Sequence, residues 1–255
     1  MNIELLSIDL SNYCSKQCTF CYNHSGVNGN VVWTPEEVIS LSHDCIENGV
    51  KAISLGGGEP FEYDGIFQII DAIQPIAYLS VTTNGLPLLN KSTWQTLVLH
   101  RPDKIHITIH NPDDHNEVQR VLRQIVLLKN TGITVGVNLL VSSNKLNSCR
   151  KVYSELRTEL SSRHIIIVPK RYSDTPSPKD LAFITNNVPF QAPSCILECK
   201  PPENFCSISW DKKVNFCSYA KGKQPLESLT FQGIIDALDR VEFQSCANSY
   251  NHNSM

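Results

Sequence analysis

Short apolar segments alternate with longer amphipathic segments over roughly the first 170 residues. The short segments have the length and composition of buried strands, and the longer ones repeat apolar residues with the period of a helix. Strands are predicted at "IELLSIDL", "KAISLGGGEP", "AYLSVTTNG", "KIHITIH", "ITVGVNLLV" and "HIIIVPK". Helices are predicted over 34–49, near 64–74, at "STWQTLVLH", at "NEVQRVLRQIVLLKNTG" and over 148–160. Parallel neighbours need crossover connections, so six β-then-α units predict a parallel sheet covered by helices.

The first predicted helix carries the clearest boundary signals. Thr34 is placed to cap it, Pro35 occupies its first turn, and Glu37 completes a capping box. Gly49 is a suitable terminator.

Polar and glycine-rich stretches follow the predicted strands. They are a cysteine-containing loop, "GGGEP", "TTNG" and "TIHNPDDHN". Right-handed crossovers curl β–α units into an α/β fold of the partial (β/α)6 barrel type. Ligands of such folds gather at the carboxyl ends of the strands, where these stretches fall.

The texture of the sequence changes after residue 172. "YSDTPSPKD" and "NNVPFQAPS" are rich in Pro, Ser and Asn, as in loops. "CSISWDKKVNFC" alternates as a hairpin with a turn near Asp211 and Lys212, a register that predicts Cys206 opposite Cys217. A helix near 232–243 follows. We therefore expect a core domain over 1–172 and a small Cys-rich extension over 173–255.

Composition narrows the class of protein. The 255 residues are 41% hydrophobic and 18% charged, with a net charge of −3. That balance gives no basic field for nucleic acid and no polybasic patch for a membrane. The segment "MNIELLSIDL" lacks the basic residues of a signal peptide, and no apolar run approaches the roughly 20 residues of a membrane span. A soluble, cytoplasmic protein is expected.

Ten cysteines are unusual for such a chain. In a reducing compartment, clustered cysteines indicate metal or redox chemistry. Cys14, Cys18 and Cys21 lie within eight residues. Three thiolates can hold three irons of a [4Fe–4S] cluster and leave the fourth iron open. Zinc with His24 as a further ligand is the alternative, although no second cysteine pair follows at zinc-finger spacing. Two isolated cysteines, Cys45 and Cys149, are expected to be buried apolar residues.

Four stretches in order carry a family resemblance. They are C-x3-C-x2-C with Phe20 before its last cysteine, "GGGEP", "TTNG" and "ITIHNPDDHNEV". Together they resemble the radical S-adenosylmethionine (radical SAM) superfamily over residues 3–170. The matching positions after the cysteines are Gly57, Gly58, Glu59, Pro60, Thr83, Asn84, Gly85, Thr108, His110 and His115. His110 stands where many members have an acid, so it could bind an anionic substrate group, act as a general acid or be structural.

The resemblance implies cofactors and a mechanism. A [4Fe–4S] cluster on Cys14, Cys18 and Cys21 would pass an electron to S-adenosylmethionine bound at its open iron. The resulting 5′-deoxyadenosyl radical would abstract a substrate hydrogen, with a reducing partner such as flavodoxin or ferredoxin. The implied cofactor-binding residues are Gly57, Gly58, Glu59, Thr83, Asn84, Thr108 and Asn138. Thr108 and Asn138 could equally be satisfied interior polar groups.

The last quarter of the chain resembles a SPASM or twitch extension, which binds auxiliary iron–sulfur clusters. Asp211 and Val214 match its hairpin, whereas Lys212 replaces its glycine. The resemblance implies one auxiliary cluster. Its expected ligands are Cys199, Cys217 and Cys246, with Cys206 or Cys195 as the fourth, or with the fourth iron open to substrate. A redox disulfide or a zinc site at Cys206 and Cys217 is the competing interpretation.

Several functions remain open at this point. The leading hypothesis is oxidation or cross-linking of a small molecule or a peptide, with Arg171, Tyr172 and His110 as candidate substrate contacts. A second is rearrangement of a purine-precursor heterocycle, as in carboxy-deazaguanine synthases. A third is a non-catalytic iron–sulfur electron-transfer protein. No nucleic-acid or membrane partner is expected.

Overall fold

The computed structural model describes residues 1–171, 174–193, 195 and 197–244. These residues form two compact units. Unit 1 contains Met1–Asp103 and the segment that begins at Lys200, and unit 2 contains Lys104–Cys199. The expected division of the chain near residue 172 stays a prediction.

Unit 1 is built on a sheet with the strand order β3-β2-β1-β7-β8-β9. Its β1, β2, β3 and β7 are parallel, as predicted for the first three, and β8 and β9 add antiparallel strands. The strands are β1 (Leu5–Asp9), β2 (Ala52–Gly56), β3 (Tyr78–Thr83), β7 (Phe205–Ile208), β8 (Lys213–Asn215) and β9 (Gln224–Pro225). The helices are α1 (Pro35–Glu47), α2 (Ile66–Ile73), α3 (Lys91–Leu99) and α7 (Phe231–Asp239), with short 3-10 turns η1 (Pro60–Glu62) and η2 (Pro87–Leu89).

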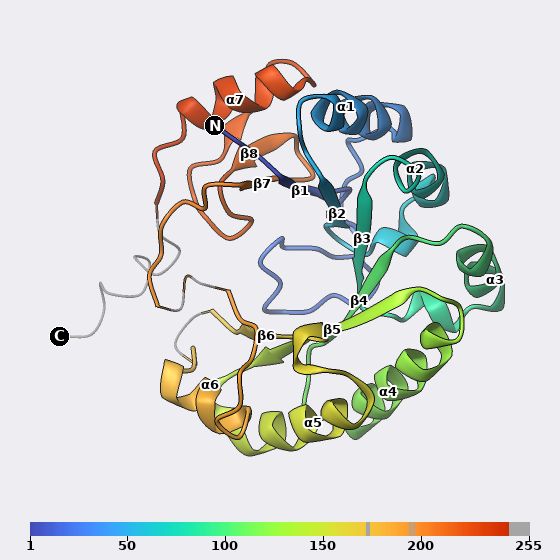
Figure 1. Cartoon of the computed structure of the whole chain (residues 1–255), viewed down its shortest axis with the longest axis vertical. Helices are drawn as coiled ribbons and strands as arrows, with labels where there is room; N and C mark the ends of the chain where they lie inside the picture. The colour runs from blue at the N-terminus through green and yellow to red at the C-terminus, as the bar shows by residue number, and fades with distance from the viewer. Residues whose placement is uncertain (172–173, 194, 196, 245–255) are drawn as a thin grey trace. The chain divides into compact units, whose positions relative to one another are not determined.

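The two faces of this sheet differ in chemistry. One face carries fully buried Leu6, Ile8, Ile53 and Leu55 beneath the helices α1 and α2 (Figure 1). The opposite face carries a row of hydroxyls at one level, because Ser7 is in register with Ser54 and Ser207, and Ser54 with Ser80. Strands buried on both faces are normally apolar throughout, so the serine row marks a face that is not part of the core.

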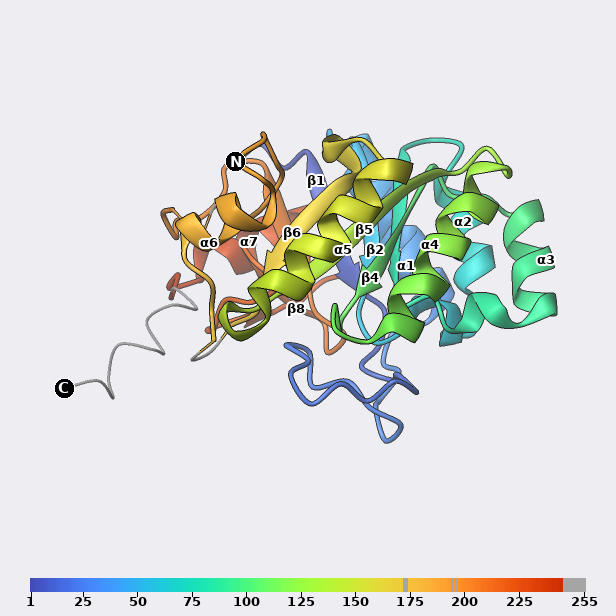
Figure 2. The ribbon, with the colours of Figure 1, turned by 90° about the horizontal axis from the view of Figure 1, so that it is seen from below.

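Unit 2 contains three parallel strands in the order β6-β5-β4, again as predicted. The strands are β4 (Lys104–Ile109), β5 (Thr134–Val141) and β6 (Ile165–Pro169). The helices are α4 (His115–Lys129), α5 (Leu146–Glu159) and α6 (Pro178–Ile184), with 3-10 turns η3 (Ser143–Lys145) and η4 (Ser162–His164). Ile105, Ile107 and Ile109 are fully buried on the face covered by α4 and α5, which lie side by side over these strands (Figure 2).

Local sequence signals explain the helix ends. The Thr34 side chain accepts the Glu37 N–H and the Glu37 side chain accepts the Thr34 N–H, so the predicted capping box is confirmed. Gly49 ends α1 with a φ of 103°. One helix was not predicted: α6 begins in the stretch expected to be loop, with Ser177 and Asp180 forming a second capping box. Its seven residues are too few to show a helical period.

The hairpin prediction is right in outline and wrong in register. Ser207 pairs with Asn215 and Ile208 with Val214, so Cys206 lies opposite position 216 and not opposite Cys217. Cys206 is fully buried and has Cys45 of α1 as a neighbour, which places it on the helix-covered face. The argument that these two cysteines face each other is therefore wrong.

The turn of this hairpin contains a lysine, Lys212, at a position where glycine is favoured. Lys212 has a φ of 58°, the left-handed conformation for which glycine is favoured. Its ammonium bonds the Glu37 carboxylate at 2.6 Å and lies 5.0 Å from the centre of the Trp33 ring. These contacts join the hairpin to the start of α1 and offset the strain at Lys212.

None of the described helices is long and apolar enough to cross a membrane.

The capping box gives a first testable prediction. Replacing Thr34 with alanine removes the side-chain acceptor of the Glu37 N–H and should lower the free energy of unfolding by about 1 kcal/mol. Chemical denaturation measures the change. Thr158→Ala is a matched control, because the Thr158 hydroxyl is exposed and bonds only the carbonyl of Glu155 within α5. Equal stability of the two variants would contradict the role of the cap.

Candidate active site

The loop that contains the three front cysteines is fastened to the GGGEP segment by backbone hydrogen bonds. Leu10 N–H donates to Gly56 O at 3.0 Å, Gly58 N–H to Ser11 O at 2.7 Å, and Glu59 N–H to Tyr13 O at 2.9 Å. The pairing of β1 with β2 thus continues past the strand ends as far as the residue before Cys14.

Two glycines make this approach sterically feasible. A Cβ on Gly58 would lie 1.8 Å from the carbonyl oxygen of Tyr13, and one on Gly57 would lie 2.6 Å from that of Ser11. Gly57 also has a φ of +113°. Any side chain at either position would force the cysteine loop away from β2.

The loop is also ordered by its own backbone. Cys14 N–H donates to Gly26 O at 3.1 Å, and Cys21 N–H donates to Cys18 O at 3.1 Å. The carboxylate of Glu62 accepts hydrogen bonds from both the backbone N–H and the hydroxyl of Ser15. Figure 2 shows the loop in blue, projecting beyond the carboxyl end of β1.

The environment of Cys14 suits a bound thiolate. Its side chain is buried, and burial, followed by the Glu59 charge, raises the pKa of its thiol. The backbone N–H groups of Lys16 and Gln17 and the Asn84 amide at 3.7 Å donate hydrogen bonds to its sulfur, which favours the thiolate. Cys18 and Cys21 are half-buried in the same loop. Sulfur donors supported in this way fit the cysteine-held cluster.

Glu59 connects GGGEP to the TTNG segment. Its Oε1 accepts the Thr83 hydroxyl at 2.6 Å and the Phe61 N–H at 3.1 Å, and its Oε2 accepts the Asn84 N–H at 2.8 Å. The carboxyl group is 1% exposed, and burial raises its pKa to about 7 against the effect of these bonds. The structure therefore brings Cys14, Glu59, Thr83 and Asn84 into one connected network.

Single-ion metal binding has no support in the described part of the chain. There, no three His, Cys, Asp or Glu side chains converge as ligands of one metal ion, and His24 is exposed. A cubane differs because each thiolate binds a different iron, so its cysteines need not converge on one point. The geometry thus offers nothing for the zinc alternative.

A buried carboxyl next to the cysteine loop was missed by the sequence argument. Asp9 is 3% exposed on the serine face of β1, and the Tyr22 hydroxyl donates to its Oδ1 at 3.3 Å. Tyr22 packs on Tyr219, with ring centres 4.7 Å apart. Burial raises the pKa of Asp9 to about 6. The signal available in the sequence was an acid at an alternate position of an otherwise apolar strand.

Two further predicted cofactor residues lie together in unit 2. Thr108 on β4 is in register with Asn138 on β5, on the face opposite the helices, and Asn138 Oδ1 is buried without a hydrogen-bond partner. The His110 ring lies 3.5 Å from the Glu117 carboxylate, which also accepts the His110 N–H at 2.9 Å. These contacts support the structural interpretation of His110.

The back cysteines that the structure describes differ in their surroundings. Cys217 in unit 1 and Cys199 in unit 2 are half-buried, and Cys206 is enclosed in the core. Arg171 donates to the sulfur of Cys195 at 3.1 Å. Cys246 and Tyr172 lie outside the described residues. The auxiliary ligand set therefore stays a prediction.

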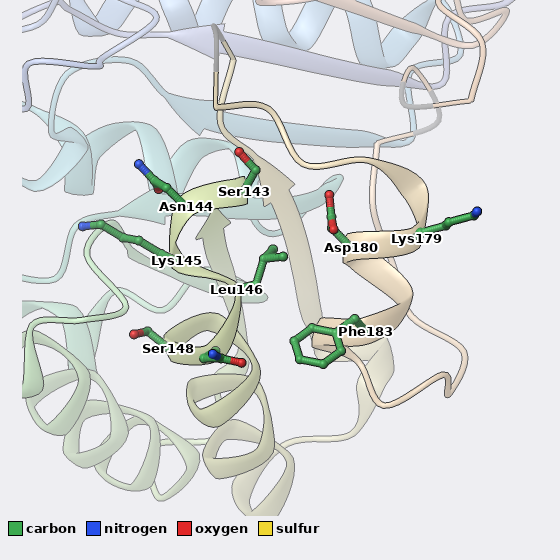
Figure 3. Close-up of a pocket in the computed structure, with 9 residues that line it drawn as sticks. Ser143, Asn144, Lys145, Leu146, Ser148, Lys179, Asp180 and Phe183 are labelled. Carbon is green, nitrogen blue, oxygen red and sulfur yellow. The ribbon is translucent and has the colours of Figure 1, made fainter.

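A pocket of about 570 Å³ lies in unit 2, where α5 begins beside α6 (Figure 3). Lys145, Asp180 and Phe183 line it, among others. Lys145 is paired with Asp113 at 2.7 Å, and Asp180 is used in the α6 capping box. Of the charged side chains that line the pocket, Lys145 and Asp180 are thus already engaged within the fold, and Lys179 is the third.

The raised pKa of Asp9 predicts a pH dependence. Between about pH 4 and pH 6 the native protein retains a proton that the unfolded chain has lost. This group therefore lowers the free energy of unfolding as pH rises through that window, by at most about 3 kcal/mol. Asp9→Asn should lack this fall in denaturation experiments over pH 4–7. Asp64→Asn, at an exposed position, should retain it, and parallel curves for wild type and Asp9→Asn would contradict the assignment.

The Glu59 network predicts a larger structural effect. Glu59→Gln supplies one oxygen where three donors now share two, so a buried donor is left unmatched. Unfolding should become easier by about 2–3 kcal/mol in chemical denaturation. Glu62→Gln is the matched control, since Glu62 makes its bonds to Ser15 at the exposed surface and should lose less than half as much. Similar losses for both would show that burial of Glu59 does not matter.

Comparison with known proteins agrees with this geometry. The sequence profile described as the Radical SAM superfamily matches residues 8–142. A Methanocella arvoryzae protein named probable GTP 3′,8-cyclase is 31% identical over 111 residues, covering 44% of this chain and 36% of that protein. A Methanocaldococcus jannaschii protein of the same name is 35% identical over 91 residues, covering 34% and 30%. The matches thus span about a third of the length of these curated relatives.

Solved structures share the fold at low sequence identity. Streptococcus suis SuiB bound to S-adenosylmethionine superposes with a TM-score of 0.68 at 15% identity, covering 85% of this chain and 60% of SuiB. The anSMEcpe protein with bound AdoMet gives 0.64 at 16% identity, covering 91% and 80%. The expected α/β fold of the partial (β/α)6 barrel type is confirmed by this likeness. The family match extends over more than half of the sequence, and the chain belongs to the radical SAM superfamily.

Proposed function

We propose that this chain is a catalyst that uses S-adenosylmethionine and a [4Fe–4S] cluster, the cofactors of its family, to remove a hydrogen atom from a substrate. When bound, these cofactors supply reductive cleavage of the sulfonium and the hydrogen-abstracting 5′-deoxyadenosyl radical. The observation that carries the proposal is the network joining the Cys14 loop, Glu59 and Asn84.

Cys14, Cys18 and Cys21 would hold the cluster. The loop backbone fixes their spacing, and the amides around Cys14 would donate hydrogen bonds to its thiolate when iron is bound. Because Gly57 and Gly58 lack side chains, the cysteine loop lies directly against the end of β2. Backbone polar groups at this end of β2 are the candidates to receive the methionine end of the cofactor. Glu59 and Thr83 would act by positioning, since their polar atoms bond each other.

Thr108 and Asn138 are proposed as the cofactor contacts of unit 2. The unpartnered Oδ1 of Asn138 supports a polar ligand there, because a buried acceptor without a donor is costly. A ribose hydroxyl would supply the missing donor. The side chain of Thr108 in the same register offers a second hydroxyl.

Two kinds of substrate and reaction are compatible with this proposal. The curated relatives are named for a cyclisation of GTP, which favours rearrangement of a purine compound. The serine row of unit 1 supports a polar substrate of either kind, a nucleotide or a peptide backbone. We favour a radical rearrangement or oxidation of a polar small molecule, with peptide modification as the second candidate.

An auxiliary iron–sulfur cluster on Cys199, Cys217 and Cys246 is the further part of this proposal. Cys206 is the weakest of the ligands considered, because it lies within the apolar core against Cys45. Cys195, already bonded by Arg171, is the better fourth ligand. Such a cluster would anchor the substrate or accept an electron from it.

Two cysteine variants test this division of labour. In anaerobically reconstituted protein with dithionite and S-adenosylmethionine, Cys18→Ala should form no 5′-deoxyadenosine, because the front cluster loses a ligand. Cys217→Ala should still form it while losing the substrate-derived product. Chromatography of 5′-deoxyadenosine measures both. Cys149→Ala, a buried cysteine of α5 with no proposed ligand role, is the control and should cleave as wild type does.

Iron content distinguishes the remaining alternatives. About eight irons per wild-type chain indicates two clusters, and about four indicates one. Failure of wild-type protein to form 5′-deoxyadenosine would favour the electron-transfer interpretation over catalysis. Normal cleavage by Cys18→Ala would remove the proposed role of Cys18, and undiminished product formation by Cys217→Ala would remove that of Cys217.

A further inference from the structure

A cluster of basic side chains lies on the face of unit 2 opposite α4 and α5, near the amino ends of its strands. Lys104 and His106 alternate along β4 with Ile105 and Ile107, which are buried against the helices. Lys104 and His106 therefore project from the opposite face. His164 lies immediately before β6, and its pKa is lowered by burial and then by the Lys104 charge. We call Lys104, His106 and His164 the amino-end cluster.

A glycine makes room for the cluster. Gly136 of β5 is in register with His106. A Cβ on Gly136 would lie 2.8 Å from His106 Cε1 and Nδ1 and 3.1 Å from Lys104 Cε. The Lys104 and His106 side chains therefore lie together over this glycine, where the sheet presents no side chain of its own.

The buried Nδ1 atoms of His106 and His164 lack hydrogen-bond partners within the described residues. His106 is 9% exposed, and its Nδ1 is buried with no hydrogen bond; the same holds for His164 Nδ1 and for the neighbouring Asn138 Oδ1. No described carboxylate lies within ion-pair distance of Lys104, and burial lowers the pKa of this half-buried amine. Burial, followed by the Lys104 charge, lowers the pKa of His106 to about 4.

This arrangement is electrostatically incomplete. A half-buried ammonium without a counter-ion and a buried imidazole nitrogen without a partner both cost free energy. Arg163 adds a further positive charge near His164. An anion that entered the cluster would neutralise the ammonium and supply hydrogen-bond partners at once.

We propose that the amino-end cluster is a binding site for a phosphate group. A phosphate presents several acceptor oxygens to the Lys104 ammonium, and its charge favours a protonated His106 whose Nδ1–H donates. Lys104 and Thr108 are four residues apart on β4, about 13 Å. The charged end of the site is thus separate from the proposed cofactor contacts, and its occupation does not depend on the proposed reaction.

Calorimetric titration of the reconstituted holoenzyme with inorganic phosphate tests the proposal. Wild-type protein should bind, and Lys104→Met should bind at least about tenfold more weakly, because a charged hydrogen bond is lost. Lys104→Arg should keep most of the affinity. Lys151→Met, an exposed position on α5, should leave it unchanged. Thermal unfolding without phosphate establishes that each variant is folded before its titration is interpreted.

Two further arms identify the ligand and the contact. If ribose 5-phosphate binds more tightly than phosphate and ribose does not bind, the ligand is a phosphate ester; equal binding of the two phosphates indicates the free ion. The imidazole NMR resonances of His106 should move on phosphate titration in wild type and stay fixed in Lys104→Met. Absence of phosphate binding by wild type, undiminished binding by Lys104→Met, or equal binding of acetate would overturn the proposal.

Discussion

The close backbone approach of residues 10–13 to residues 56–59 is the constraint on which the candidate active site depends. Hydrogen bonds carry the β1–β2 pairing beyond the strand ends, and the absence of side chains at Gly57 and Gly58 allows it. Cys14 is thereby held beside Glu59, which receives the N–H of Asn84, whose amide in turn donates to Cys14. Three segments that are distant in sequence are therefore joined in one hydrogen-bonded ring, and displacement of any of them would move the first cysteine.

The polar side chains of the strands lie on the faces opposite the helices, whereas the helix-covered faces are apolar. In unit 1 this polarity is a row of hydroxyls ending near the acid Asp9, and in unit 2 it is Lys104, His106 and Asn138. Parallel strands buried on both sides favour continuous apolar sequence. Hydroxyl, amide and basic side chains at alternate strand positions lower the stability of the core, because they add no apolar packing. Departures of this kind are expected where a sheet face serves a ligand.

Most of the fold could be predicted from local sequence signals, whereas the pairings between distant segments could not. Six strands and the main helices follow from periodicity, and the Thr34 cap and Gly49 follow from residue chemistry at helix ends. The parallel pairing of β7 with β1 could not be predicted from the sequence, because nothing in either segment specifies its partner. The hairpin register was misjudged because Lys212 adopts a glycine-like conformation in the turn. The cysteine and GGGEP segments were recognisable, whereas the Asp9–Tyr22 contact joins residues whose types alone carry no signal.

Charge distribution favours the amino-end cluster over the cysteine loop as the place for an anionic ligand group. Near the loop, Asp9 and Glu59 are buried carboxyls whose raised pKa values, about 6 and about 7, express the cost of adding negative charge there. At the amino end of unit 2 the sign is reversed, since burial and then the positive charge of Lys104 lower the pKa values of both His106 and His164. A phosphate placed by electrostatics alone would therefore avoid the carboxyl end of β1 and be retained by the cation that lacks a counter-ion.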